Sequence, residues 1–196
     1  MDIVSLHPSN IDPRAIGRAV SLLARGELVA YPTDSHPAVA ADALNASAVN
    51  NLCRLKNVNP AKQTLTLVCC SIAQAARYAR IDNRAFQLIK RNTPGPFTFI
   101  LPPASSLPKV YKGRRQVGIR IPDNPIALSL AETLSRPLLS GSIDNADPSD
   151  FDNCVAMVLT DASVDVDAAM MSTAVVDLTD SSAPQVIREG PFSLSE

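Results

Sequence analysis

The sequence predicts an α/β fold, a twisted mixed sheet flanked by helices, and two observations support this prediction. Helical periodicity alternates with short apolar, β-branched runs along almost the whole chain. Several of these runs are apolar at successive positions, as in strands that are buried on both faces. The chain has 196 residues, 46% of them hydrophobic, and a formal net charge of −1. These values exclude a disordered chain and suit one domain over residues 1–196.

Capping and stop residues predict the bounds of the first helices. Asp12-Pro13 places an N-cap acceptor before a proline at the first helical position, and Gly26 supplies a stop for that helix. The segment 27–33 reads as a buried strand that Pro32 interrupts near its end. Ser47 is the expected N-cap of a second helix that runs to about Lys56.

The middle of the chain continues the alternation. The segment 64–70 is β-branched and apolar, which predicts a strand. Ser71 and Asp82 are the expected N-caps of two further helices. In the second of these helices, Phe86 and Ile89 share one face.

The remaining elements are predominantly strands, with one more helix between them. Asp123 or Asn124 caps this helix, and Pro125 stands at its start. The expected strands are 97–101, 117–121, 137–142, 155–160, 173–178 and 185–187.

The cysteine and histidine content indicates neither a disulfide framework nor a zinc site. The four cysteines show no C-x-x-C spacing, so we interpret them as buried thiols in a reducing compartment. No cluster supplies the four nitrogen or sulfur ligands of a structural zinc ion. The N-terminus lacks the pattern of a signal peptide, and no apolar stretch of about 18 residues appears. We therefore expect a soluble cytoplasmic protein without a membrane partner or a structural metal.

Positive and negative charge are concentrated in different parts of the chain. Residues 1–143 hold 17 Lys and Arg against 8 Asp and Glu, and residues 144–196 hold 1 against 11. The basic part suggests an anionic partner, whereas packing of the two parts against each other would intermix their surface charges. An isoelectric point near 6.1 argues against a dedicated nucleic-acid module and favours a small anion in a local pocket.

Polar residues at predicted element ends are the candidates for chemistry. They are Thr33-Asp34-Ser35, Lys56, Thr98, Arg120 and Ser140-Gly141-Ser142. Open α/β sheets bind ligands beyond the carboxyl ends of their strands, and hydroxyls with a lysine and an arginine suit an anion such as phosphate. Neither a P-loop nor G-x-G-x-x-G occurs, so a nucleotide would need an unorthodox site. Structural interpretations stay open: Lys56 as a solvated helix-end cation, Asp34 as a turn residue and Thr98 as an ordinary strand residue.

Several motifs in a fixed order make the pattern specific. They are Tyr31-Pro32-Thr33-Asp34-Ser35, Leu55-Lys56, Thr93-Pro94-Gly95-Pro96-Phe97-Thr98-Phe99-Ile100-Leu101, Gly118-Ile119-Arg120-Ile121-Pro122, Pro137-Leu138-Leu139-Ser140-Gly141-Ser142, Ser172-Thr173-Ala174-Val175-Val176-Asp177 and Val186-Ile187-Arg188-Glu189-Gly190. In this order the chain resembles the YrdC/YciO family over roughly residues 10–192. The segments 82–94 and 123–128 are especially similar to the YciO branch.

The resemblance implies a single YrdC-like domain with a concave basic cleft and a specific reaction. YrdC members are threonylcarbamoyl-AMP synthases, nucleotidyltransferases that condense L-threonine, bicarbonate and ATP with release of pyrophosphate. The product serves threonylcarbamoyladenosine modification of tRNA. The implied cofactor chemistry is ATP as substrate with Mg²⁺, and the implied partners are ATP, L-threonine, bicarbonate and tRNA or double-stranded RNA.

The resemblance also assigns roles to residues. Lys56 and Arg120 are the expected catalytic residues: Lys56 resembles a lysine that contacts phosphate, and Arg120 an arginine that faces the amino-acid carboxylate. The expected substrate and nucleotide contacts are Thr33, Ser35, Thr98, Ser140, Ser142, Ser172 and Arg188.

The chain departs from the family pattern at three places. Val58 fills the arginine position of a K-x-R motif, and Asp144 stands at the asparagine position of S-x-N. The segment 36–40 replaces a turn of an aromatic residue and glycine after Thr33. Val58, Asp144 and the basic part of the chain motivate an alternative hypothesis, a non-catalytic protein of the YciO type that binds double-stranded RNA or tRNA.

Overall fold

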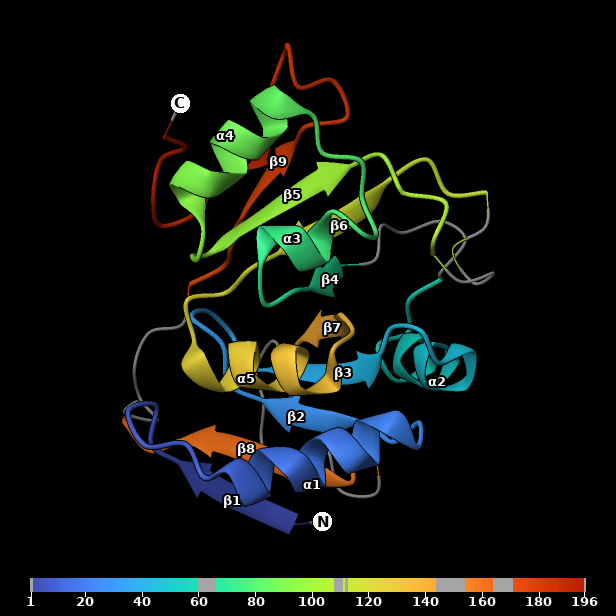
Figure 1. Cartoon of the computed structure of the whole chain (residues 1–196), viewed down its shortest axis with the longest axis vertical. Coiled ribbons are helices and arrows are strands. Elements are labelled where there is room, and N and C mark those ends of the chain that lie inside the picture. Colours follow the sequence, from blue (N-terminus) through green and yellow to red (C-terminus); the bar gives the residue numbers. More distant parts are fainter. Residues whose placement is uncertain are drawn as a thin grey trace.

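The computed structural model describes residues 2–59, 66–107, 111, 113–143, 154–163 and 171–195 (Figure 1). Strands and helices alternate along these residues as the sequence predicts. In chain order the elements are β1 (Asp2–Leu6), α1 (Pro13–Ala24), β2 (Val29–Tyr31), β3 (Ala38–Asp42), α2 (Ala46–Leu55), β4 (Thr66–Val68), α3 (Ile72–Ala75), α4 (Asn83–Asn92), β5 (Phe97–Leu101), β6 (Val117–Arg120), α5 (Pro125–Leu134), β7 (Leu138–Ser142), β8 (Met157–Asp161), β9 (Ala174–Asp177) and β10 (Gln185–Arg188).

The strands form one mixed sheet, which confirms the predicted fold class. Its order over the described residues is β1-β8-β2-β3-β7-β4-β6-β5-β9-β10. Four pairs are parallel, β1–β8, β2–β8, β4–β6 and β5–β9, and the other pairs are antiparallel. In Figure 1 the strands β5, β6 and β9 run diagonally across the upper part, whereas β2, β3 and β8 run almost horizontally below. This rotation is the ordinary twist of a large sheet.

Two apolar clusters lie on opposite faces of the sheet. Neighbouring strand residues go to different clusters, because side chains alternate along a strand: Leu67 belongs to one and Val68 to the other. Helices α2, α3 and α4 pack in the first cluster, and α1 and α5 pack in the second. In Figure 1, α1 and α5 lie against the part of the sheet that contains β1, β8, β2 and β3.

Most predicted helix starts are confirmed. The side chains of Asp12, Ser71 and Asp82 accept backbone N–H groups at the starts of α1, α3 and α4. Asn124 is the N-cap of α5. The Ser47 prediction is wrong, because Asn45 caps α2 and accepts from Ser47 N and Ala48 N.

Some expectations about strands and burial are also corrected. Strands β1 and β3 were not predicted, and β3 begins at Ala38 inside the segment interpreted as a turn. Phe86 is 39% exposed, whereas Ile89 is fully buried. Cys154 is exposed and Cys70 half-buried; only Cys53 and Cys69 are buried.

Among the described residues, no helix is both long enough and apolar enough to cross a membrane.

Candidate functional site

Arg120 at the end of β6 lies at the centre of a group of hydroxyl and carboxylate side chains. Its Nη2 donates to Thr33 Oγ1 at 3.2 Å, to Ser35 Oγ at 2.8 Å and to Asp34 Oδ1. The Arg120 side chain is only 9% exposed, and that of Asp34 is 11% exposed. Three predicted site residues, Thr33, Ser35 and Arg120, therefore meet here, and Asp34 joins them.

The loop that follows β2 is fixed by its own hydrogen bonds. Thr33 Oγ1 donates to His36 O at 2.8 Å and accepts from Ser35 N at 3.0 Å. Asp34 Oδ2 accepts from Asp123 N at 2.9 Å, which ties this loop to the start of α5. The loop thus places its hydroxyls over Arg120 before any ligand binds.

The register of the sheet explains why Arg120 lies among polar neighbours. Arg120 pairs with Thr98 on β5 and with Val68 on β4, so these three side chains share one face. Ser140 on β7 lies on the same face, because it pairs with Thr66, two residues before Val68. Val68 belongs to the apolar cluster that contains α1 and α5, so Thr98, Arg120 and Ser140 lie on the sheet face against which these two helices pack.

Tyr31 connects this group to the end of β7. Its hydroxyl lies 2.7 Å from Ser140 Oγ, and its side chain is buried in the apolar cluster that contains α1 and α5. Burial raises the pKa of Tyr31 to about 12, so the phenol is neutral near pH 7. Tyr31 therefore acts as a fixed hydrogen-bond partner that orients the Ser140 hydroxyl.

A pocket of about 430 Å³ lies at the end of β7. Four predicted site residues line it: Lys56, Ser140, Ser142 and Arg188. The pocket walls also include Leu52, Cys53, Val58, Thr66, Leu139 and Gly141. Among the described residues, Lys56 and Arg188 supply the cations of this wall.

Lys56 is the C-cap of α2, and its side chain crosses to β7. Its Nζ donates to Ser142 O at 2.5 Å. The helix ends there because Asn57 takes a left-handed conformation with φ of 51°, which asparagine tolerates better than most residues. Burial raises the pKa of the neighbouring Cys53 thiol, which keeps this sulfur protonated.

Arg188 and Thr98 are joined through Thr173, a residue that sequence reasoning did not select. Arg188 donates from Nε to Thr173 O and from Nη2 to Thr173 Oγ1, both at 2.9 Å. Thr173 Oγ1 lies 3.4 Å from Thr98 Oγ1. The predicted contact Ser172 is exposed and has no hydrogen-bond partner among the described residues. The hydroxyl that links Arg188 to Thr98 is therefore that of Thr173, one residue after the predicted contact Ser172.

Of the three sequence departures, two can be placed. Val58 lines the pocket beside Lys56 and is partly buried. His36 O and Pro37 O accept hydrogen bonds from Thr33 and Ile143, so the segment without glycine forms a defined turn into β3. Asp144 lies outside the described residues.

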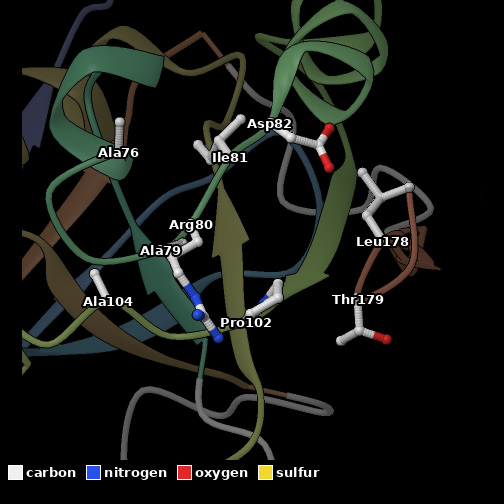
Figure 2. Close-up of a pocket in the computed structure, with 9 residues that line it drawn as sticks. All are labelled: Ala76, Ala79, Arg80, Ile81, Asp82, Pro102, Ala104, Leu178 and Thr179. Atoms are coloured by element: carbon white, nitrogen blue, oxygen red, sulfur yellow. The ribbon is translucent and has the colours of Figure 1, made fainter. Parts of the chain in front are cut away.

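A second pocket, of about 420 Å³, lies elsewhere in the fold (Figure 2). It lies where β5 and β9 end, and Asp82 at the start of α4 is part of its wall. The carboxylate of Asp82 already accepts from Ala85 N and Ser181 Oγ, and these bonds lower its pKa. No predicted site residue lines this pocket, which leaves the end of β7 as the candidate site.

The groups of the candidate site suit an anion. No group of three or more His, Cys, Asp or Glu side chains is close enough to hold a metal within the parts of the chain that the structure describes. Hydroxyls, one buried guanidinium and two further cations are instead the groups that bind carboxylates and phosphates.

Fold and site together define an α/β protein with a candidate anion site at the end of β7 in a mixed sheet. The Sua5/YciO/YrdC family model, described as "Telomere recombination", matches residues 21–190. The chain belongs to this family, which confirms the resemblance seen in the sequence.

Individual relatives agree with the family match. The chain is 34% identical to the uncharacterized protein YciO of Escherichia coli K12 in an alignment that covers 94% of this chain and 93% of YciO. It is also 34% identical to the threonylcarbamoyl-AMP synthase of Enterobacter sp. strain 638 over 134 residues, which cover 65% and 69% of the two chains.

Solved structures support the same assignment. The crystal structure of E. coli YciO superposes with a TM-score of 0.86 at 32% identity and covers 98% of both chains. The crystal structure of Sua5 from P. abyssi complexed with L-threonine superposes with a TM-score of 0.85 at 27% identity. It covers 97% of this chain but only 58% of Sua5.

Proposed function

We propose that this protein is an L-threonylcarbamoyl-AMP synthase that acts on L-threonine, bicarbonate and ATP. One observation carries the proposal: a buried guanidinium among hydroxyls shares a sheet face with Ser140, and Ser140 also lines a pocket with two cations. The first group suits a small carboxylate, and the second suits a polyphosphate. The synthase relatives and the L-threonine complex of Sua5 support this combination.

Arg120 is the group we assign to the threonine carboxylate. Its described hydrogen bonds all start at Nη2, and its buried Nε has no hydrogen-bond partner among the described residues. A buried donor without an acceptor is costly, and a ligand carboxylate would supply one. The Thr33 and Ser35 hydroxyls lie within reach of the same ligand, because both already contact the guanidinium.

Lys56 and Arg188 are the groups we assign to the phosphates of ATP. An ammonium has three donors, and Lys56 uses one of them on Ser142 O. Ser140 and Ser142 also line this pocket, and Thr98 is linked to Arg188 through Thr173. Mg²⁺ would enter with ATP as part of the substrate, bound mainly by phosphate oxygens.

The reaction can be written with these groups in place. The amine of threonine must be neutral to add to carbon dioxide from bicarbonate, and a site with little water favours the neutral amine. The resulting carbamate oxygen attacks the α-phosphorus of ATP, and the bond to the pyrophosphate oxygen breaks. Threonylcarbamoyl-AMP, pyrophosphate and water are the products. Negative charge grows on the phosphate oxygens during this step, and Lys56 and Arg188 stabilise it.

Pyrophosphate release from ATP by the purified protein tests the proposal. We expect release that requires both L-threonine and bicarbonate. Lys56→Ala should reduce its rate about tenfold or more, as loss of a charge-assisted contact does. Lys90→Ala is the matched control, since Lys90 is an exposed lysine on α4, and it should leave the rate unchanged. No threonine-dependent release, beside an active synthase assayed in parallel, would contradict the proposed activity.

A further inference from the structure

We propose that Gly141 is a positioning residue for Lys56: its missing side chain lets the lysine lie across β7 and deliver its ammonium to the pocket. The inference concerns how this chain places its phosphate-binding cation. That the cation binds ATP rests on the proposed function, whereas the packing of Lys56 on Gly141 does not.

The lysine stem fills the space where a side chain at position 141 would be. A Cβ built on Gly141 would lie 3.0 Å from Lys56 Cγ, 3.4 Å from Cδ and 3.7 Å from Cε. The methylene chain therefore runs flat over the strand, and its end reaches Ser142 O one residue further on. A side chain at position 141 would force the lysine stem to shift by a few tenths of an ångström, whereas glycine leaves it in place.

The backbone of Gly141 gives no other reason for glycine. Positive φ angles occur at Gly26 and Gly113 among the described glycines, and Gly141 is not one of them. It pairs in regular register with Val39 on β3. Glycine inside a strand weakens it, and it commonly marks a close approach of another group. At position 141 that group is Lys56.

The position of Lys56 matters because the neighbouring cation of the family motif is absent. Val58 lines the pocket where the motif has arginine, so α2 and its C-terminal turn contribute one cation to this wall. The backbone of Lys56 is fixed at the C-terminus of α2, and its Nζ is held by a hydrogen bond to Ser142 O. Gly141 lies between these two anchors.

The first experiment measures the chemical accessibility of the Lys56 amine. Purified protein is treated with a limiting amount of acetylating reagent, and acetylation at Lys56 is quantified by mass spectrometry. Gly141→Ala should raise this acetylation, because the added methyl forces the stem to shift and thereby weakens the bond from Nζ to Ser142 O. Gly17→Ala is the matched control, since a Cβ at Gly17 meets nothing within 4 Å. Unchanged Lys56 acetylation in folded Gly141→Ala would overturn the inference.

The second experiment asks whether Gly141 acts on ligand binding through Lys56. The affinity for MgATP is measured by calorimetry for wild type, Gly141→Ala, Lys56→Ala and the double variant. We expect each single variant to weaken binding about tenfold and the double variant to be no weaker than Lys56→Ala, as for coupled residues. Additive losses would overturn the positioning role. Absence of MgATP binding by wild type would instead contradict the proposed function, and the acetylation result would still decide the packing.

Discussion

The ion pair between Arg120 and Asp34 is both the centre of the candidate carboxylate site and a structural element. Both side chains are about nine-tenths buried, and Asp34 also accepts from Asp123 N. Sequence reasoning selected Arg120 but left Asp34 as a turn residue, because a carboxylate after Pro32 is common in turns. What the sequence does not contain is the pairing of β6 with β4 and β5, which places Arg120 under the loop.

The ion pair between Arg120 and Asp34 leads to a prediction about Arg120→Ala. The variant should lower the free energy of unfolding by about 3 kcal/mol, because it leaves the Asp34 carboxylate buried without its cation. It should also abolish threonine binding, measured by calorimetry with ATP and L-threonine together.

The double variant Arg120→Ala/Asp34→Asn separates the two effects. It removes the unpaired charge, so stability measured by urea unfolding should recover in part, whereas threonine binding should not. If the double variant regained threonine affinity, Arg120 would have no direct role in binding.

At the scale of the elements, local signals predicted helices better than strands. Helix caps are local, so Asp12, Ser71 and Asp82 could be recognised from a few residues. Strand β3 reads Ala-Val-Ala-Ala-Asp and lacks both alternation and β-branched density, so nothing local marks it as a strand. Its pairing with β2 and β7 stabilises it instead.

For the N-cap of α5 the sequence offers two candidates, Asp123 and Asn124. The structure selects Asn124, whose buried Oδ1 accepts from Ile126 N at 3.0 Å and from Ala127 N at 3.1 Å. Asn124→Ala should therefore lower the free energy of unfolding by about 1–2 kcal/mol, measured by urea unfolding. Asp123→Ala is the control, since Asp123 contributes its backbone N–H to Asp34 and that group remains. A larger loss in Asp123→Ala than in Asn124→Ala would refute this account of the cap.

At the scale of the whole molecule, the sheet interleaves the two parts of the chain that differ in charge. Strand β8 comes from the acidic part and lies between β1 and β2, and β9 pairs with β5. The charge difference along the sequence therefore does not divide the described sheet into a basic half and an acidic half. RNA binding, which the basic part of the chain helped to suggest, stays a prediction, whereas a local anion site does not depend on separated charges.

The same long-range order explains why the site could be predicted only in pieces. Four strands separate β7 from β10 in the sheet, which is about 24 Å from one strand to the other in a flat sheet. Arg188 on β10 nevertheless lines the same pocket as Ser140 on β7. The approach of these two strands depends on the three-dimensional course of the whole sheet, which no local sequence pattern reports.

Arg188 therefore tests whether the sheet as a whole builds the site. Its strand is exposed along its length, so Arg188→Ala should change the free energy of unfolding little. The same variant should weaken MgATP binding about tenfold in calorimetry, because a cation that reaches the pocket from the far edge is lost. Arg188→Lys should restore only part of the affinity, since lysine cannot make both bonds to Thr173 in the same geometry. Arg84→Ala, an exposed arginine on α4, is the control. Equal MgATP affinity in wild type and Arg188→Ala would show that β10 lies near the pocket without contributing to it.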